Sequence, residues 1–265
     1  MTLIKRADGR VEEFDSMRVL SLCKRLGVPG KFAHEVIAKV KNQLKYGDTT
    51  QRIAQLVKAE LPFRFSLLYG LREAVAALEP AKFEVYVSRV LIANGYACTT
   101  NVIIPGEAIE HEVDIIAAKK DNLFLVECKH HINPHRDCGL DNVLQLQATL
   151  EDIEDGYKKK QNPYHFTQGW LITNTRFSAH ASHYAAAKNI MLSGWRYKST
   201  FSLTHMIEHK HAFPTTILQL PRHVISFFMR NNILTIQDIL LNKHLLSITF
   251  GRKIVKEALT QILTL

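Results

Sequence analysis

The hydrophobic period of the chain changes at Gly95, and this change constrains the fold more than any other feature of the sequence. Before Gly95, apolar residues recur every three or four positions, as on the buried face of a helix. After it they alternate, as in strands that are buried on one face. Alternation covers residues 96–104, 109–117 and 123–130. The sequence therefore predicts a helix over residues 82–94 followed by a meander of three strands.

The segments after the meander predict two crossovers that return to the same sheet. Helical patterns over residues 141–160 and 179–189 are each followed by a short apolar strand, at 169–174 and 190–192. A strand joined to its neighbour through a helix is typical of a parallel pair. We expect an α/β layer architecture in the centre of the chain.

Both flanks of this central part are dominated by helical patterns. The N-terminal flank begins with a predicted hairpin over residues 3–14 that turns at Asp8-Gly9. Its predicted helices cover residues 16–26, 31–44, 50–61 and 65–78, and those of the C-terminal flank cover 221–231, 236–241 and 252–263. The expected fold class is α/β multidomain, with a hairpin-capped helical bundle over residues 1–79, an α/β domain over 80–212 and a small helical domain over 213–265.

The composition excludes a membrane protein and a disordered chain. Of 265 residues, 46% are hydrophobic and 22% are charged, and no apolar stretch reaches the ~18 residues that a membrane span needs. The first residues are charged and lack the apolar core of a secretory signal, which predicts a cytoplasmic protein. The four scattered cysteines favour free thiols in such a compartment.

The net charge of +9 is unevenly distributed. The predicted domains carry +5, 0 and +4 in chain order. Basic ends are typical of proteins that meet polyanions, although a solvated surface would give the same composition. The neutral central domain keeps as many carboxylates as cations, which leaves carboxylates available for a role other than binding polyanions.

Asp114, Glu127 and Lys129 form the sharpest constellation of the sequence. Glu127 and Lys129 share one face of a predicted strand because side chains two positions apart point the same way. Asp114 interrupts the apolar run of the neighbouring strand. Because adjacent strands bring such side chains within about 5 Å, the two carboxylates could share one divalent cation, Mg²⁺ or Mn²⁺. Lys129 would orient or deprotonate water or stabilise charge on a phosphate. A surface ion pair between Glu127 and Lys129 is the alternative.

Five motifs in this part of the chain resemble the PD-(D/E)xK nucleases, and specifically the Mrr-like restriction endonucleases. They are Phe83-Glu84-Val85, Asn94-Gly95-Tyr96, Val113-Asp114-Ile115-Ile116-Ala117, Val126-Glu127-Cys128-Lys129-His130 and Leu171-Ile172-Thr173-Asn174-Thr175-Arg176-Phe177-Ser178. The resemblance implies that Asp114 and Glu127 bind the metal and that Lys129 is the catalytic lysine. It also implies that Glu84 is a further acid and that Gln147, or less directly Gln145, lines the site. The chain departs from the family in the stretch Glu110-His111-Glu112 before Asp114, and in Glu127, where the family often has Gln.

A zinc site is the alternative use of this region. Cys128, His130, His131, His135 and Cys138 are zinc-ligand types. Their spacing matches no paired zinc motif, and Cys128 is predicted to face away from Lys129. We expect His131 and Asn133 to contact phosphate or to shape the loop instead.

The predicted N-terminal hairpin gathers cations around a glycine turn. Lys5, Arg6, Gly9 and Arg10 suit a polyphosphate, because glycine permits close approach and arginine binds phosphate bidentately; a solvated hairpin tip is the alternative. The motifs Ile4-Lys5-Arg6-Ala7-Asp8-Gly9-Arg10, Glu13-Phe14-Asp15 and Leu68-Tyr69-Gly70-Leu71-Arg72 resemble the ATP-cone, a nucleotide-binding regulatory domain. The resemblance implies that ATP or dATP binds these four residues as a signal, with Lys41 as a further phosphate contact.

The C-terminal segment resembles a helix-hairpin-helix unit. Its motifs are Asn232-Ile233-Leu234-Thr235-Ile236-Gln237-Asp238-Ile239-Leu240 and Phe250-Gly251-Arg252-Lys253-Ile254-Val255-Lys256-Glu257-Ala258-Leu259. In such a unit a glycine turn presents backbone N–H groups to a DNA phosphate. Gly251, Arg252, Lys253 and Lys256 would make the contact. A helical oligomerisation tail is the alternative, and Phe250 replaces the usual second glycine.

These features predict a Mg²⁺- or Mn²⁺-dependent DNA endonuclease that is regulated by ATP or dATP, with a role in restriction, defence or DNA repair. We expect no membrane partner and a homo-oligomer. Two alternatives remain: an inactive nucleotide-sensing DNA-binding regulator built on a nuclease scaffold, and a ribonuclease that uses the same site.

Overall fold

The computed structural model describes residues 2–6, 8–134, 136–197 and 201–265 and divides the chain into two compact units. One unit contains residues 1–71 together with 260–265, and the other contains residues 72–259. Within the described residues, no helix combines the length and the apolar composition that crossing a membrane requires.

The N-terminal unit is a small hairpin with a helical core beside it. Strands β1 (Leu3–Lys5) and β2 (Val11–Glu13) pair antiparallel, as the turn at Asp8-Gly9 predicts. Four helices follow in this unit: α1 (Ser16–Arg25), α2 (Gly30–Gln43), α3 (Thr50–Glu60) and α4 (Phe63–Tyr69). The side chains of Asp15 and Thr49 cap α1 and α3 by accepting backbone N–H bonds. The apolar faces of these helices meet in one core that includes Val19, Val40 and Leu56.

The helix predicted over residues 65–78 is interrupted, and this part of the prediction is wrong. Helix α4 ends at Tyr69, and α5 (Leu71–Ala76) begins after Gly70. The N–H of Gly70 bonds to the carbonyl oxygens of Ser66 and Leu67, which closes the first helix. Leu67, Leu71 and Val75 are all buried at helical spacing, so the apolar pattern continues across the break.

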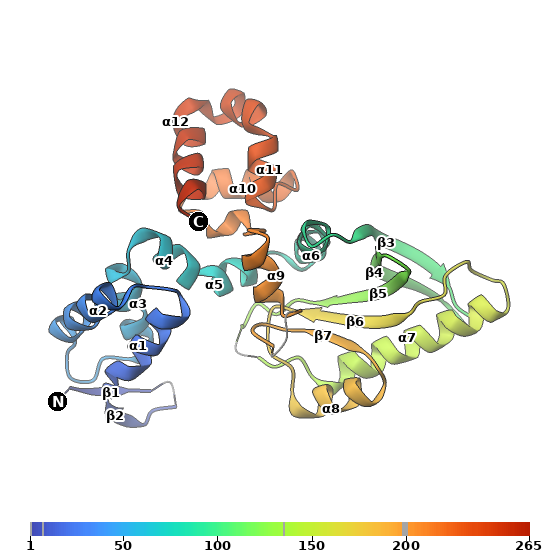
Figure 1. Ribbon diagram of the computed structural model, residues 1–265, viewed down its shortest axis with the longest axis horizontal. Helices are drawn as coiled ribbons and strands as arrows, with labels where there is room; N and C mark the ends of the chain where they lie inside the picture. The colour runs from blue at the N-terminus through green and yellow to red at the C-terminus, as the bar shows by residue number, and fades with distance from the viewer. Residues whose placement is uncertain (1, 7, 135, 198–200) are drawn as a thin grey trace. The chain divides into compact units, whose positions relative to one another are not determined.

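The second unit, residues 72–259, contains a five-stranded mixed sheet (Figure 1). The strands are β3 (Ala97–Pro105), β4 (Glu110–Lys119), β5 (Asn122–Lys129), β6 (Gln168–Thr173) and β7 (Met191–Ser193). Their spatial order equals their chain order, with antiparallel β3-β4-β5 followed by parallel β5-β6-β7. The predicted meander with two later crossovers is confirmed.

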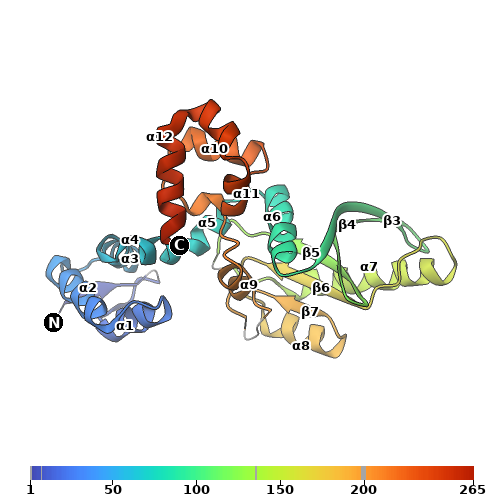
Figure 2. The same cartoon turned by 45° about the horizontal axis from the view of Figure 1, so that its top comes forward.

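Helices cover both faces of this sheet (Figures 1 and 2). Helix α6 (Pro80–Ala93) lies on one face, and α7 (Leu140–Lys158) and α8 (Ala179–Ala187) lie on the other. Under α6, the rings of Tyr96, Phe124 and Trp170 pack together. Under α7 and α8, Leu125 and Leu171 of the central strands join a second apolar cluster. Because both faces are buried, a charged side chain within the central strands is exceptional.

The described C-terminal part of the chain is helical, as predicted, with three segments that the sequence did not indicate. The predicted helices are α10 (Arg222–Arg230), α11 (Ile236–Leu241) and the second part of α12 (Lys243–Thr264). The missed segments are α9 (Leu203–His209), which Ser202 caps, the short 3₁₀ helix η1 (Thr215–Ile217) and the first part of α12. Gly251 interrupts α12 with φ 79° and ψ 161°.

Candidate active site

Asp114, Glu127 and Lys129 come together where the carboxyl end of β5 lies beside the middle of β4, as predicted. Ile115 of β4 pairs with Val126 of β5, so the preceding Asp114 lies across from Glu127. The backbone N–H of Cys128 donates a hydrogen bond to Oδ2 of Asp114 at 2.7 Å. The bond holds the carboxylate against the strand that carries the other two residues.

The strand fixes Glu127 and Lys129 on the same face. Nζ of Lys129 lies 2.8 Å from Oε1 of Glu127, and both side chains are largely buried. The carbonyl oxygen of Lys129 accepts a bond from the hydroxyl of Thr173, at the end of β6. The lysine is thus positioned by its side chain and by its backbone. Cys128, between them, is buried on the opposite face.

Burial and like charges raise the pKa of Asp114. Removal from water is the largest cause, the charges of Glu127 and Glu84 add to it, and the pKa reaches about 7. The bond from Cys128 and the charge of Lys129 act in the opposite direction. Asp114 therefore takes up a proton more readily than an ordinary aspartate, because its ionised form is buried beside other negative charges.

Glu84 of α6 is the third acid of this cluster. Its pKa is raised by burial and then by the charges of Glu127 and Glu112. Glu112 was not singled out from the sequence as a site residue. It lies two positions before Asp114 on β4, and the alternation of the strand would have placed it on the face of Asp114.

Lys129 remains a cation in this setting. Burial lowers its pKa, but the hydrogen bond and charge of Glu127 and the charge of Asp114 outweigh it, and the pKa is raised overall. A lysine with a raised pKa is a poor general base at neutral pH, whereas it can stabilise negative charge well.

The donor set fits a divalent cation. Asp114, Glu127 and Glu84 are partly buried carboxylates whose charges repel one another. They offer the hard oxygen ligands that Mg²⁺ and Mn²⁺ prefer. Among the described residues, no three His, Cys, Asp or Glu side chains are already arranged as metal ligands. A magnesium ion in a nucleotide-processing site commonly uses only one or two carboxylates, with water and phosphate oxygens as the rest.

Gln147 lies away from this cluster along α7. Its amide donates to Oε1 of Glu151 at 2.6 Å. It lines a hollow of about 290 Å³ with Leu150, His165 and Lys188, and none of Asp114, Glu127 and Lys129 lines that hollow. Gln145 is exposed on the same helix. Among the described residues, no hydrogen bond joins either glutamine to Asp114, Glu127 or Glu84.

The loop after β5 is tied to the end of β6 through two residues. The backbone N–H of His131 donates to Oδ1 of Asn174, and the amide of Asn174 donates to the carbonyl of His131, both at 2.8 Å. Both ring nitrogens of His130 and Nε2 of His131 are buried without a hydrogen-bond partner. Burial is the main reason that the pKa of each histidine is lowered. His135 lies outside the described residues.

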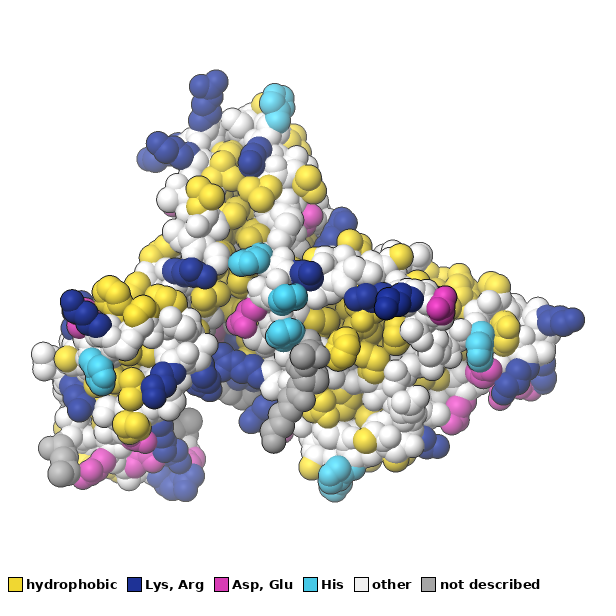
Figure 3. All heavy atoms as spheres, viewed as in Figure 1, with side chains coloured by type: hydrophobic (Ala, Val, Ile, Leu, Met, Phe, Trp, Pro, Cys, Tyr) yellow, Lys and Arg dark blue, Asp and Glu magenta, His cyan; other side chains and the backbone are white. Residues whose placement is uncertain are grey.

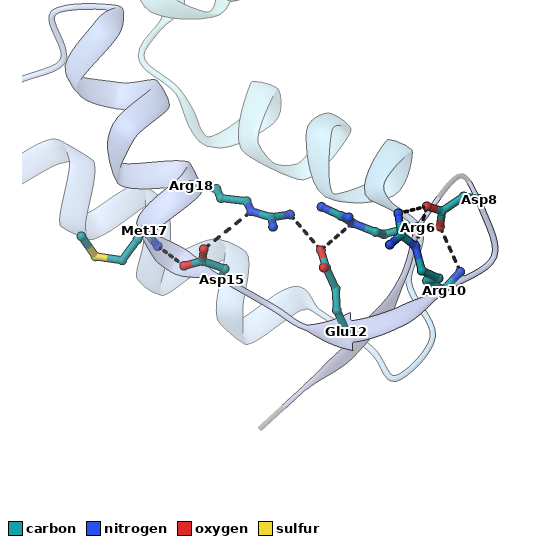
Figure 4. A network of polar contacts seen from close by, with 7 residues as sticks. All are labelled: Arg6, Asp8, Arg10, Glu12, Asp15, Met17 and Arg18. Carbon is teal, nitrogen blue, oxygen red and sulfur yellow. Dashed lines mark hydrogen bonds and ion pairs between the residues drawn. The ribbon is translucent and has the colours of Figure 1, made fainter.

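The two arginines of the N-terminal hairpin are paired with acids of the same hairpin (Figure 4). Arg6 contacts Glu12 at 2.9 Å, and Arg10 contacts Asp8. Gly9 has φ 86°, which suits the turn. Lys5 and Lys41 are exposed, and no carboxylate of the described residues pairs with them. Ala7, within the same motif, lies outside the described residues.

The proposed DNA contact of the C-terminal segment lies where α12 is interrupted. Gly251, Arg252, Lys253 and Lys256 are exposed at the start of the second part of the helix. Figure 3 shows Lys and Arg side chains on the surface of helices α10 to α12, at the top of the view. The ring of Phe250 packs edge-on against Phe227 of α10 at 5.0 Å, which explains an aromatic residue next to this glycine.

Comparisons with known proteins match the part of the chain that carries the candidate site. A family model described as restriction endonuclease matches residues 75–194. An uncharacterized protein of Archaeoglobus fulgidus is 31% identical over 153 residues, which are 58% of this chain and 83% of that protein. The crystal structure of a protein of unknown function, AF1548, is similar with a TM-score of 0.58 and 29% identity, over 69% of this chain and 98% of that one.

Proposed function

Because the chain belongs to the restriction endonuclease family, through the domain that covers residues 75–194, we propose that it is a divalent-metal-dependent endonuclease that hydrolyses DNA and is regulated by a nucleotide. The observation that carries the proposal is the hydrogen bond from Cys128 to Asp114 beside the ion pair of Glu127 and Lys129. This arrangement gathers two acids and a cation in the setting that phosphodiester hydrolysis requires.

Asp114 and Glu127 would hold the metal ion, with Glu84 as a further acid. When bound, Mg²⁺ or Mn²⁺ would supply a hydroxide at neutral pH and neutralise charge on the phosphate. Asp114 must lose its proton to serve, and its raised pKa makes this step sensitive to pH near 7.

Lys129 would stabilise the negative charge that develops on the phosphate oxygens. Its raised pKa keeps it protonated, which favours this role over deprotonation of water. Glu127 and Thr173 would orient it through its side chain and its backbone carbonyl.

The N-terminal hairpin would bind the phosphates of ATP or dATP through Lys5, Arg6, Gly9 and Arg10. Lys5 is exposed and unpaired by any described carboxylate, whereas Arg10 is engaged by Asp8 and Arg6 by Glu12. Binding would exchange these carboxylates for phosphate oxygens, which arginine also takes bidentately. A nucleotide with different affinity for two states of the protein is sufficient for regulation.

A cleavage assay tests the proposal. Supercoiled and linear DNA would be incubated with the full chain and Mg²⁺ or Mn²⁺, with and without ATP or dATP. We expect cleavage that requires the metal, is lost in Lys129→Ala and changes in rate with nucleotide. Equal products from the wild type and Lys129→Ala would overturn the assignment of the site. Cleavage of single-stranded RNA but not of DNA would favour a ribonuclease.

A further inference from the structure

A group of arginines lies at the edge of the sheet where the active-site strand ends. Strands β5, β6 and β7 are parallel, so their carboxyl ends meet at one edge. Arg176 lies shortly after β6 and Arg196 shortly after β7. Arg72, at the start of α5, joins them, and we refer to Arg72, Arg176 and Arg196 as the arginine cluster. The edge of carboxyl ends is where α/β sheets bind ligands.

The charges of Arg176 and Arg196 both act on the guanidinium of Arg72. The pKa of Arg72 is lowered by burial first and then by the charge of Arg176, and Arg196 adds to the effect. Glu73 and Asp137 offset it only in part, because the pKa remains lowered. Like charges held together in a half-buried place destabilise the protein unless an anion joins them.

The hydrogen bonds that the structure gives Arg72 leave part of its donor capacity unused. One terminal nitrogen donates to the carbonyl of Pro134, in the loop after β5. Its Nε is buried and has no hydrogen-bond partner. An arginine needed only to hold this loop would be expected to satisfy that nitrogen as well.

Arg176 is the exposed member of the cluster. Its side chain is 67% exposed, and its contact with the half-exposed Asp137 is 3.5 Å long. An exposed ion pair of this length stabilises a protein very little, so the contact with Asp137 alone gives little reason for the charge. The residue is thus available to a ligand from solvent.

The register of the sheet places the start of the Arg176 loop beside Lys129. Lys129, at the end of β5, pairs with Thr173 at the end of β6, three residues before Arg176. The backbone N–H of Cys138, in the loop after β5, donates to the carbonyl of Arg176 at 2.7 Å. A ligand on Arg176 would therefore lie beside the active site.

We propose that the arginine cluster binds backbone phosphates of the DNA strand next to the bond that is cut. Guanidinium groups bind phosphate bidentately, and a strand supplies several phosphates in a row. The proposal rests on the proposed function, since it assigns the substrate path of the same site. The cluster would position DNA and would take no part in the chemical step.

DNA binding measured without cleavage tests the proposal. The full chain with Lys129→Ala would bind a short labelled duplex without divalent metal, at several salt concentrations. Adding Arg176→Ala should weaken binding and reduce the slope of log affinity against log salt by about 1, as expected for one lost phosphate contact. Adding Arg72→Gln should act in the same direction. Arg89→Ala, an exposed arginine of α6, should leave affinity and slope unchanged.

The outcomes separate this inference from the proposed function. Arg176 is exposed, so its variant should fold, and a thermal melt of each variant checks this. If Arg176→Ala and Arg72→Gln bind DNA like Arg89→Ala while the wild type cuts DNA, the arginine cluster is not a phosphate site and the function stands. If the wild type neither binds nor cuts DNA, the proposed function fails and this inference with it.

Discussion

Oδ2 of Asp114 accepts the backbone N–H of Cys128 at 2.7 Å, across the two strands that carry the candidate site. Cys128 lies between Glu127 and Lys129, so the bond fixes the acid of one strand against the acid and lysine of the other. A carboxylate that is held through the backbone keeps its place when a neighbouring side chain is changed. Substitutions at Lys129 should therefore test chemistry and leave folding intact.

Lys129→Ala should abolish most cleavage and leave the fold unchanged. Loss of one donor that stabilises developing charge typically lowers the rate by about 10²–10³-fold. We expect this loss in single-turnover cleavage of a DNA substrate, with an unchanged thermal midpoint. Lys188→Ala, an exposed lysine after α8, is the matched control. A variant that cleaves at the rate of the control would show that Lys129 takes no part.

The pKa of Asp114 makes stability depend on pH in a definite direction. Its ordinary value is 3.8 and its folded value is about 7, so the native state holds the proton more tightly than the unfolded state. The stability that the protonated carboxyl group of Asp114 contributes is fully present below pH 4 and is lost as pH rises through 7. Without metal, Asp114→Asn should therefore gain stability over the wild type between pH 4 and 8. The gain in the free energy of unfolding should be on the order of 2 kcal/mol. One pKa unit equals about 1.4 kcal/mol, and the partial exposure of Asp114 reduces the effect of the full shift.

Urea unfolding of both proteins at several pH values measures this difference. Asparagine keeps an oxygen that can accept the bond from Cys128, so the comparison isolates the charge. Mg²⁺ should stabilise the wild type at pH 8 more than Asp114→Asn, by mass action on the deprotonated acid. Asp152 is a control for which stability should change with pH in the opposite direction. Hydrogen bonds from the N–H of Ala108 and then from His111 lower the pKa of this carboxyl group. Parallel pH profiles for the wild type and Asp114→Asn would contradict the assignment.

The central fold was predictable because the two hydrophobic periods differ so clearly. The end of α6 at Gly95, with φ 85°, coincides with the change of period. The break at Gly70 was not predictable from periodicity, since Leu67, Leu71 and Val75 remain in phase across it. Propensity at a single glycine is a weaker signal than a continuous apolar face.

The core of the site was predictable because it depends on local rules. Alternation places Glu127 and Lys129 on one face, and a meander makes the strand of Asp114 their neighbour. Arg72, Arg176 and Arg196 follow no such rule. Arg176 and Arg196 follow strands that are adjacent and parallel, and Arg72 reaches the loop after β5 from helix α5. The order of strands joined by crossovers is not fixed by residue spacing.

Asp8→Asn should strengthen nucleotide binding by the hairpin. The carboxylate of Asp8 engages Arg10, and this contact lowers the pKa of Asp8. Removing a competing carboxylate frees the guanidinium for phosphate. Because the pair is exposed to solvent and therefore weak, the gain in affinity for ATP should be at most a few-fold. Arg10→Ala should weaken binding, and calorimetry with ATP and dATP measures both. No binding by any variant would leave the hairpin as a solvated tip.

Arg252→Ala combined with Lys253→Ala should weaken DNA binding if the interruption of α12 is a phosphate contact. Both residues are exposed just after Gly251, where a new helical segment begins. Loss of two phosphate contacts should lower the slope of log affinity against log salt by about 2. Lys243→Ala, on the first part of the same helix, is the matched control. Gly251→Ala should weaken binding too and lower stability by about 1–3 kcal/mol. The added methyl group would meet no neighbour, but a backbone with φ 79° and ψ 161° is essentially open only to glycine. If the double variant binds DNA as the control does but changes its mass in light scattering, the segment joins copies of the chain instead.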